Sequence, residues 1–202
     1  MSETSAIAPA RAFVRPSRDD DVPAMLAIYR HHISHGVGDL GEYEDASLDA
    51  EDLKRRRKNM RGRRLPHLVA ERAAEVLGYA YAVPFRKRPA YRFAVKHSIY
   101  VRHDVVHEGL GRMLLNALID ACAAADYRQM IGYIDGANVA SLRLHQACGF
   151  REAGRLLSIG YKFGRWTDSI VVQRSLGLGA TAAPGQWPTL EAADPAGGAQ
   201  GE

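Results

Sequence analysis

The sequence has only two cysteines, Cys122 and Cys148, and they do not form a CxxC pair. A disulfide framework and a metal site are therefore not expected, and two reduced core thiols fit a cytoplasmic protein. No apolar run approaches the roughly 20 residues that a membrane helix needs. Residues 1–13 lack the basic region and apolar stretch of a secretory signal. These absences favour a cytoplasmic protein without a membrane span.

The length of 202 residues favours one folded domain with a sizeable core. A hydrophobic share of 47% and a charged share of 25% are typical of a globular protein. Residues 1–10 are small and polar and are interpreted as a flexible leader to a domain over residues 11–176. From Gly177 onward Ala, Gly, Pro and Thr dominate, a composition that buries too little apolar surface to hold a fold. Residues 177–202 are therefore predicted to form a disordered tail.

The net charge of +4 is concentrated in residues 54–64, where Lys or Arg occupies eight of the eleven positions. A nucleic-acid surface is one interpretation of this basic run. A solvated helix face with Leu53 and Met60 turned inward is favoured, because no aromatic platform or nucleic-acid motif accompanies it. A third interpretation is that some of these arginines attract an anionic cofactor or an acidic substrate.

Hydrophobic periodicity predicts strands alternating with helices. Strands are expected near residues 12–15, 67–71, 75–83, 92–101, 129–134, 151–161 and 167–175. Helices are expected after Asp19–Asp21, from Ser47 through the basic run, from Gly109 and from Asn138. The glycine-rich segment 35–43 is predicted to be a loop. Strands that flank crossover helices imply an α/β fold, with a mixed sheet and helices on both faces.

Residues 94–112 predict a strand, a short polar loop and a helix that begins with glycine. Gly109 and Gly111 flank Leu110, and apolar residues then follow at helical spacing. The first backbone N–H groups of a helix lack intrahelical partners, and the helix dipole adds positive potential there. The loop therefore suits a phosphate or pyrophosphate, although the same pattern also fits a plain structural turn.

A second segment, Asn138–Phe150, has the pattern N-x-x-S-x-x-x-H-x-x-x-G-F. Asn138 can cap a helix and Gly149 can end it. The chain thus has a strand, a helix that begins with GxG, a second strand and the helix from Asn138, in that order. This order resembles the acetyl-CoA-binding core of the GNAT N-acetyltransferase superfamily. The chain resembles more closely the phosphinothricin and methionine sulfoximine acetyltransferase branch, over residues 12–176. The closer match is carried by residues 27–29, 76–80, 91–92, 97–101 and 162–168.

This resemblance implies a GNAT-like fold with a mixed, mostly antiparallel sheet, and a homodimer. It also implies acetyl-CoA as co-substrate and transfer of acetyl to the primary amine of a small, amino-acid-like acceptor. The backbone of Ile99, Tyr100 and Val101 would pair with the pantetheine amides, and Asn138 and Ser141 match contacts to the same arm. The pyrophosphate would lie against the loop formed by Val106, His107, Glu108, Gly109, Leu110, Gly111 and Arg112. Residues near the acceptor in this branch match Tyr29, Tyr91 and Arg92.

The candidate proton-transfer residues are Lys96, His97 and His145. Many superfamily members have at the position of His145 a tyrosine that protonates the leaving thiolate. A histidine can serve as this acid, or it can merely pack against the cofactor. Relatives commonly read V-E-H-S or V-E-D-S, with the glutamate as general base, whereas Lys96 stands there in this chain. His97 could replace that base only if a bulge turned it to the other face of the strand.

A second departure from the family lies in the pyrophosphate loop. Val106 stands where the family usually has Gln or Arg, and Glu108 places an acid beside the expected anion. The departures leave two alternatives beside a working N-acetyltransferase. One is an acetyl-CoA-binding protein with impaired catalysis, and the other is an acetyltransferase for a macromolecular amine. Nucleic acid is a disfavoured partner, and neither a membrane nor a metal is expected.

Overall fold

The computed structural model of the chain describes residues 10–35, 48–105 and 107–184. Its centre is a seven-stranded sheet in the order β1-β2-β3-β4-β5-β7-β6. The strands are β1 Phe13–Pro16, β2 His67–Arg72, β3 Glu75–Pro84, β4 Ala94–Val101, β5 Gln129–Asp135, β6 Arg151–Lys162 and β7 Arg165–Ser175. All neighbours pair antiparallel except β4 and β5, which run parallel. The predicted mixed, mostly antiparallel sheet is confirmed.

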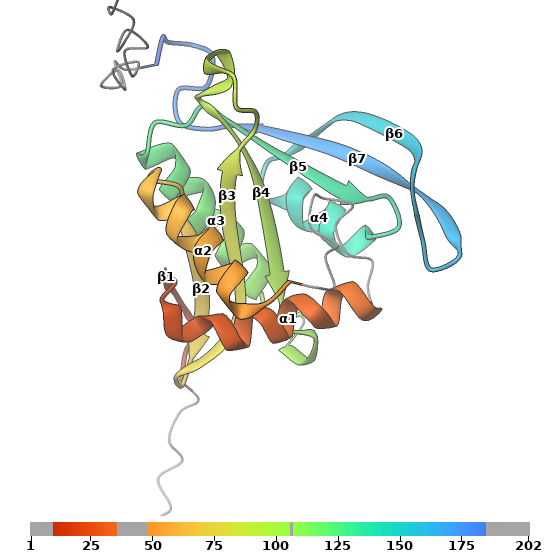
Figure 1. The fold of residues 1–202 in the computed structure, drawn as a ribbon. Helices are drawn as coiled ribbons and strands as arrows, with labels where there is room; N and C mark the ends of the chain where they lie inside the picture. Colours follow the sequence, from red (N-terminus) through yellow and green to blue (C-terminus); the bar gives the residue numbers. More distant parts are fainter. Residues whose placement is uncertain (1–9, 36–47, 106, 185–202) are drawn as a thin grey trace, which may run out of the picture.

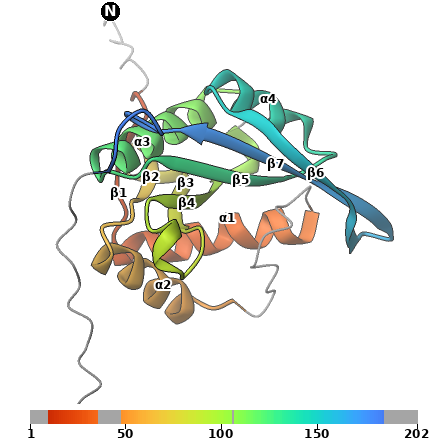
Figure 2. The ribbon, with the colours of Figure 1, turned by 90° about the horizontal axis from the view of Figure 1, so that it is seen from above.

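Helices cover both faces of the sheet (Figures 1 and 2). The α-helices are α1 Val22–His35, α2 Ala50–Gly62, α3 Leu110–Ala124 and α4 Val139–Ala147. Short 3₁₀ helices are η1 Asp19–Asp21, η2 Pro89–Tyr91 and η3 His103–Val105. Helices α1 and α2 lie on one face, and α3 and α4 lie on the other. None of the described helices is long and apolar enough to cross a membrane.

Helix α3 packs closely on the centre of the sheet because β3 carries a glycine at the contact. A Cβ atom at Gly78 would lie 2.7 Å from the Tyr100 carbonyl oxygen and 3.0 Å from Leu114 Cδ1. The absence of a side chain therefore lets α3 and β4 approach β3. The buried face of α3 consists of Leu110, Leu114, Leu115, Leu118, Ile119 and Cys122. This packing fixes the N-terminus of α3 beside the end of β4.

The helix that contains the basic run begins later than the sequence predicts. Asp49, rather than Ser47, precedes its first residue, and the Asp49 carboxylate accepts a hydrogen bond from the Asp52 backbone N–H at 2.8 Å. Ser47 lies outside the described residues. Leu53 and Met60 are buried, as the favoured interpretation requires. Arg57 is also buried, because its guanidinium donates to the Ser17 carbonyl at 2.9 Å and pairs with Asp19. The run is therefore not uniformly a solvated face.

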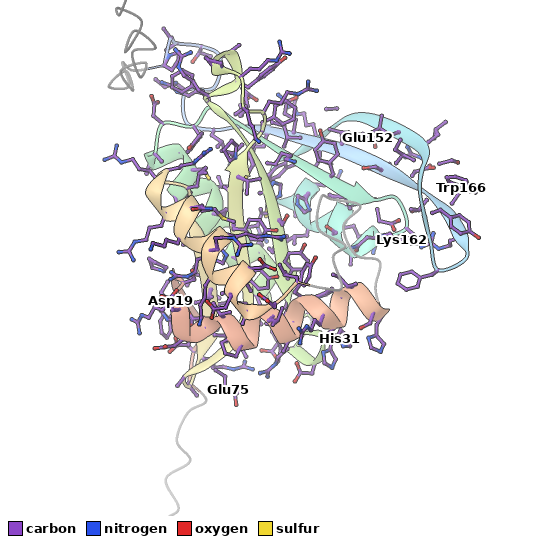
Figure 3. The ribbon with its side chains drawn as sticks, viewed as in Figure 1. Asp19, His31, Glu75, Glu152, Lys162 and Trp166 are labelled. Atoms are coloured by element: carbon purple, nitrogen blue, oxygen red, sulfur yellow. The ribbon has the colours of Figure 1, made fainter. Side chains whose placement is uncertain are left out.

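The β6–β7 hairpin extends beyond the body of the sheet (Figures 1 and 3). The large apolar side chains of its outer part are exposed: Leu156, Leu157, Ile159, Tyr161, Phe163 and Trp166. Trp166 projects from its outer part and is 64% exposed (Figure 3). A patch of this kind on a folded protein marks a surface that contacts another molecule.

Several predictions concern residues outside the described parts. These are residues 1–9 of the predicted leader, most of the predicted loop 35–43, Val106, and residues 185–202 of the predicted tail. Residues 177–184, which belong to the predicted tail, form turns in the structure. The Gly179 and Thr181 backbone N–H groups donate to the carbonyls of Leu176 and Leu178, respectively, and Leu176 is buried. These turns follow directly after β7.

Candidate functional site

The sheet forks between β4 and β5. The two strands pair only at Ala94–Gln129, Val95–Met130 and Lys96–Ile131, although β4 continues to Val101 and β5 to Asp135. Past Lys96 the backbone edge of β4 has no β5 partner, so an extended amide chain can pair with it as an added strand. Of the predicted pantetheine contacts, Ile99 and Val101 have their backbone groups on this edge, whereas those of Tyr100 face β3; the Val101 carbonyl lies 2.8 Å from His32 Nε2.

A cleft of about 140 Å³ occupies the fork. Strand β4 contributes His97 to Tyr100, and β5 contributes Gly132 to Asp135. Asn138, Ser141, Leu144 and His145 close it from the α4 side, and His32 closes it from α1. The structure thus brings together the predicted residues Ile99, Tyr100, Asn138, Ser141, His97 and His145 around one cleft. Lys96 is not among the residues that line it.

Two histidines from opposite walls of this cleft are in direct contact. His97 Nε2 lies 2.8 Å from His145 Nε2, and the side chains are 5% and 3% exposed. His97 Nδ1 lies 3.0 Å from the carbonyl oxygen of Ile131, which stands at the last β4–β5 pair before the fork. Burial and His145 lower the pKa of His97 to about 3, and burial also lowers the pKa of His145. The contact is possible because β5 has Gly132 at this point: a Cβ there would lie 2.8 Å from His97 Cε1.

The predicted pyrophosphate loop ends at the N-terminus of α3. Gly109 precedes the helix with φ +77°, a left-handed conformation that glycine adopts easily, and it provides no capping side chain. The first N–H groups of α3 are therefore oriented to receive an anion. Glu108, the acid expected to oppose that anion, forms an ion pair with Arg72 of β2. Arg112 is exposed on the first turn of the helix.

Asn138 and Ser141 form the N-terminal cap of α4. Asn138 Oδ1 accepts a hydrogen bond from the Ser141 backbone N–H at 3.0 Å, so the capping role weighed for Asn138 is present. The Ser141 carbonyl oxygen lies 2.7 Å from His145 Nδ1, and its hydroxyl lies 3.3 Å from the same nitrogen. The cap therefore also orients His145 within the cleft.

Lys96 and His97 lie on opposite faces of β4. The register with β3 is continuous from Gly78–Val101 to Pro84–Val95, so no bulge turns His97 toward the face of Lys96. The condition under which His97 could replace the family's base is therefore not met. Lys96 pairs with Val83 and lies on the α1–α2 face, where Val83 lines a second and larger cavity.

This second cavity has a volume of about 600 Å³ and lies between α2 and the end of β3. Its cationic lining residues are Arg56, Arg63, Arg86 and Lys87, and its aromatic ones are Tyr29, Tyr79, Tyr81 and Phe85. No acidic side chain is among the described residues that line it. Two arginines of the basic run thus lie where the third interpretation of that run needs them, beside a space for an acidic ligand.

The three predicted acceptor residues differ in their positions. Tyr29 is buried, packs edge-on against Tyr100 and lines the larger cavity. Tyr91 is not among the lining residues, but its ring lies 5.7 Å from that of Phe85, which lines the cavity. The Arg92 guanidinium instead lies over the Phe93 ring at 4.5 Å, and Arg92 is not among the lining residues.

Sequence reasoning missed His67 at the base of the larger cavity. The side chain is 7% exposed, and neither ring nitrogen has a hydrogen-bond partner among the described residues. Burial and the nearby Arg57 guanidinium lower its pKa to about 4, so the ring is neutral near pH 7. Its ring stacks on those of Tyr81 and Tyr79, which alternate along β3. That tyrosine alternation is the one signal in the sequence that could have indicated a polar aromatic wall.

Comparison with known families identifies the fold and the chemistry. A family model described as an acetyltransferase (GNAT) domain matches residues 14–171. A phosphinothricin N-acetyltransferase from Alcaligenes faecalis is 45% identical over 172 residues, which are 85% of this chain and 86% of that relative. An L-methionine sulfoximine/L-methionine sulfone acetyltransferase from Pseudomonas aeruginosa strain PAO1 is 37% identical over 169 residues, 82% of this chain and 95% of that relative.

Solved structures agree with these sequence relatives. A GNAT superfamily phosphinothricin acetyltransferase from Sinorhizobium meliloti, in complex with AcCoA, superposes with a TM-score of 0.81 at 36% identity. The match covers 87% of this chain and 94% of that structure.

Proposed function

The chain belongs to the GNAT acetyltransferase family and is an acetyl-CoA-dependent N-acetyltransferase, and we propose that its acceptor is the primary amine of a small amino acid with acidic groups. The relatives are named for small amino acids that carry a carboxylate, to which phosphinothricin adds a phosphinate. The observation that carries the proposal is the large cavity, whose described lining has four cationic side chains and no acidic one.

We assign the two cavities to the two substrates. The fork receives the pantetheine arm of acetyl-CoA along the free edge of β4, and the N-terminus of α3 receives its pyrophosphate. The larger cavity lies on the face of β4 that carries Lys96, and it receives the acceptor. Transfer then takes place where the two spaces meet, beside the point at which β4 and β5 separate. Backbone N–H groups of β4 past Lys96 would polarise the thioester carbonyl.

Arg56, Arg63 and Arg86 would hold the acceptor's carboxylate and its second polar group (phosphinate, sulfoximine or sulfone) through charge-assisted hydrogen bonds. Tyr29 packs against the apolar part of the acceptor, and Tyr91 supports Phe85 and Arg86 at the cavity margin. His145 acts as the acid for the leaving thiolate. Lys96 stands where relatives have their general base, and we assign the ammonium proton to water in the fork.

An acceptor panel tests this proposal. Release of the CoA thiol is measured with phosphinothricin, methionine sulfoximine and methionine sulfone, and with the methyl ester of each. The free acids should exceed their esters at least tenfold in kcat/KM, because a hydrogen bond to a charged group contributes about 1.5–3 kcal/mol. Equal rates for acids and esters would contradict an acidic acceptor.

Two double variants separate the cavity from the rest of the basic run. Arg56→Gln with Arg63→Gln should raise the acceptor KM about tenfold or more and leave the acetyl-CoA KM unchanged. Arg55→Gln with Lys58→Gln is the matched control, since Arg55 and Lys58 are exposed on the same helix and do not line the cavity. The control should change stability by no more than about 0.5 kcal/mol per site.

We also propose that the protein is a cytoplasmic homodimer that pairs through the β6–β7 hairpin. The exposed apolar side chains of that hairpin support the pairing, and two free, buried thiols fit a reducing compartment. Light scattering should find a dimer for the unmodified chain and a monomer for Trp166→Glu. Leu178→Glu places the same charge on an exposed leucine outside the hairpin and should leave the dimer intact.

A further inference from the structure

The contact between His97 and His145 constrains where protons can lie. The two imidazoles come from β4 and α4, 48 positions apart in the sequence, and their Nε2 atoms are 2.8 Å apart. This distance is that of a hydrogen bond, and a hydrogen bond needs a proton on one nitrogen and a lone pair on the other. The proton count of the pair can therefore be worked out from its outer contacts.

Both outer nitrogens face backbone carbonyls. His97 Nδ1 lies 3.0 Å from the Ile131 oxygen, and His145 Nδ1 lies 2.7 Å from the Ser141 oxygen. A carbonyl oxygen only accepts, so each Nδ1 must carry a hydrogen. The Ser141 hydroxyl could donate to His145 Nδ1 from 3.3 Å, but the carbonyl, which is closer, would then face a lone pair.

Two neutral rings cannot satisfy this arrangement. A neutral imidazole has one N–H, and the carbonyls require it at Nδ1 on both rings. Both Nε2 atoms would then present lone pairs to each other at 2.8 Å. One additional proton between them completes every hydrogen bond. A second additional proton would place two cations in contact, and burial together with His145 lowers the pKa of His97 to about 3.

The cleft holds one carboxyl group besides the two imidazoles. Of the residues that line the cleft, the other titratable ones are His32 from α1, Tyr100 from β4, and Tyr133 and Asp135 from β5. Asp135 is 1% exposed, and its Oδ2 has no hydrogen-bond partner among the described residues. Other neighbours are uncharged: Phe150, whose ring centroid is 5.1 Å from each imidazole, and Val172 of β7 beside Gly132. Burial opposes the charge of the pair and lowers the pKa of both histidines, whereas the hydrogen bonds to the Ile131 and Ser141 carbonyls favour it.

We propose that His97 and His145 share one proton, and that His97 is a positioning residue which keeps His145 charged for its role as acid. This inference rests on the proposed function. As the C–S bond of the thioester breaks, its electron pair stays on sulfur, and the shared proton moves from His145 to that sulfur. The acceptor nitrogen loses two protons as it becomes an amide; one refills the pair and the other enters solvent. The uncharged pair has two opposed lone pairs, which favours this refilling.

The shared proton is tested directly by ¹⁵N NMR of histidine-labelled protein without substrates. Near pH 7 both Nδ1 atoms should carry a proton, and the two Nε2 atoms should show one proton between them. Two neutral rings with no shared proton under these conditions would overturn the inference. The measurement needs neither an acceptor nor turnover, so it is independent of whether the proposed acceptor class is right.

The role of His97 is tested by His97→Phe, which removes the acceptor for the His145 proton. We expect kcat to fall about 10- to 100-fold, while KM for acetyl-CoA changes by no more than about twofold. In the dependence of kcat on pH, the basic limb should move to lower pH. His97→Gln is the matched variant, because its amide can donate to Ile131 and accept from His145. It should restore part of the rate and part of the shift. A loss of rate in His97→Phe without movement of the basic limb would show only a structural role and overturn the proposal. If NMR shows the shared proton but the protein transfers acetyl to none of the amino acids in the acceptor panel, the proposed function is overturned and the shared proton is not.

Discussion

The substitution Gly132→Ala adds one methyl group at the point where β5 faces the histidine pair. That methyl would lie 2.8 Å from His97 Cε1 and 3.0 Å from Val172 Cγ2. The His97 ring cannot easily withdraw, because Ile131 and His145 hold its two nitrogens. Overpacking of this kind costs about 1–3 kcal/mol, and the lower entropy of the unfolded chain offsets about 0.4–1 kcal/mol of it. We expect a net loss of about 1–2 kcal/mol in the free energy of unfolding.

For a domain of this size, such a loss lowers Tm by roughly 2–8 °C. The displaced ring should also lower kcat about tenfold, since general acid catalysis is worth at least that much. Gly154→Ala in β6 is the matched control, because a Cβ there has no atom within 4 Å. Differential scanning calorimetry and thiol release are measured on both variants. Equal stability and equal kcat for the two would refute the steric reasoning at Gly132.

Three further predictions concern separate parts of the site. Gly109→Asp combines a left-handed φ with a negative charge at the anion loop, so calorimetry should find CoA affinity at least tenfold weaker in folded protein; unchanged affinity would remove the anion-loop argument. Lys96→Glu should supply the family's base and raise kcat on methionine sulfone about tenfold or more; a fall in kcat with a higher acceptor KM would instead assign Lys96 to binding an acidic group. His67 has its folded pKa lowered to about 4 from the model-compound value 6.5, so its contribution to stability is present above pH 6.5 and is lost as pH falls toward 4, by about 3 kcal/mol. His67→Phe should remove this part of the pH dependence in urea unfolding, and an unaltered dependence would contradict a buried neutral ring.

Local signals predicted most elements of this fold, because periodicity and capping act over a few neighbouring residues. The helix from Asn138 shows this, since its cap and its apolar spacing are contiguous in the sequence. The predicted start of α2 was three residues too early, because local capping signals cannot choose between two nearby candidates. Ser47 and Asp49 are both good capping types, and only the hydrogen bond to Asp52 distinguishes them.

The two halves of the candidate site differ in how far the sequence could predict them. The residues predicted for the acetyl-CoA side lie in contiguous motifs on β4, α3 and α4, so resemblance could propose them. The proposed acceptor cavity is lined from α1, α2, β2 and β3 and the loops after α2 and β3, and its cationic residues are up to 31 positions apart, from Arg56 to Lys87. No local pattern joins them. The basic run therefore suggested a surface, whereas the fold turns Arg56 and Arg63 toward the same cavity as Arg86.

His97 shows why the alternation of strand residues is an incomplete guide to function. Alternation correctly placed His97 on the face of β4 opposite Lys96, and on that basis alone it has no part in the acceptor's chemistry. The opposite face is where α4 brings His145, and the Ile131 carbonyl at the last β4–β5 pair fixes the ring. Only a glycine at position 132 leaves room for the ring between the strands. His145, the Ile131 carbonyl and Gly132 thus meet at the imidazole of His97. The proton that His97 shares with His145 follows from this geometry and not from a sequence motif.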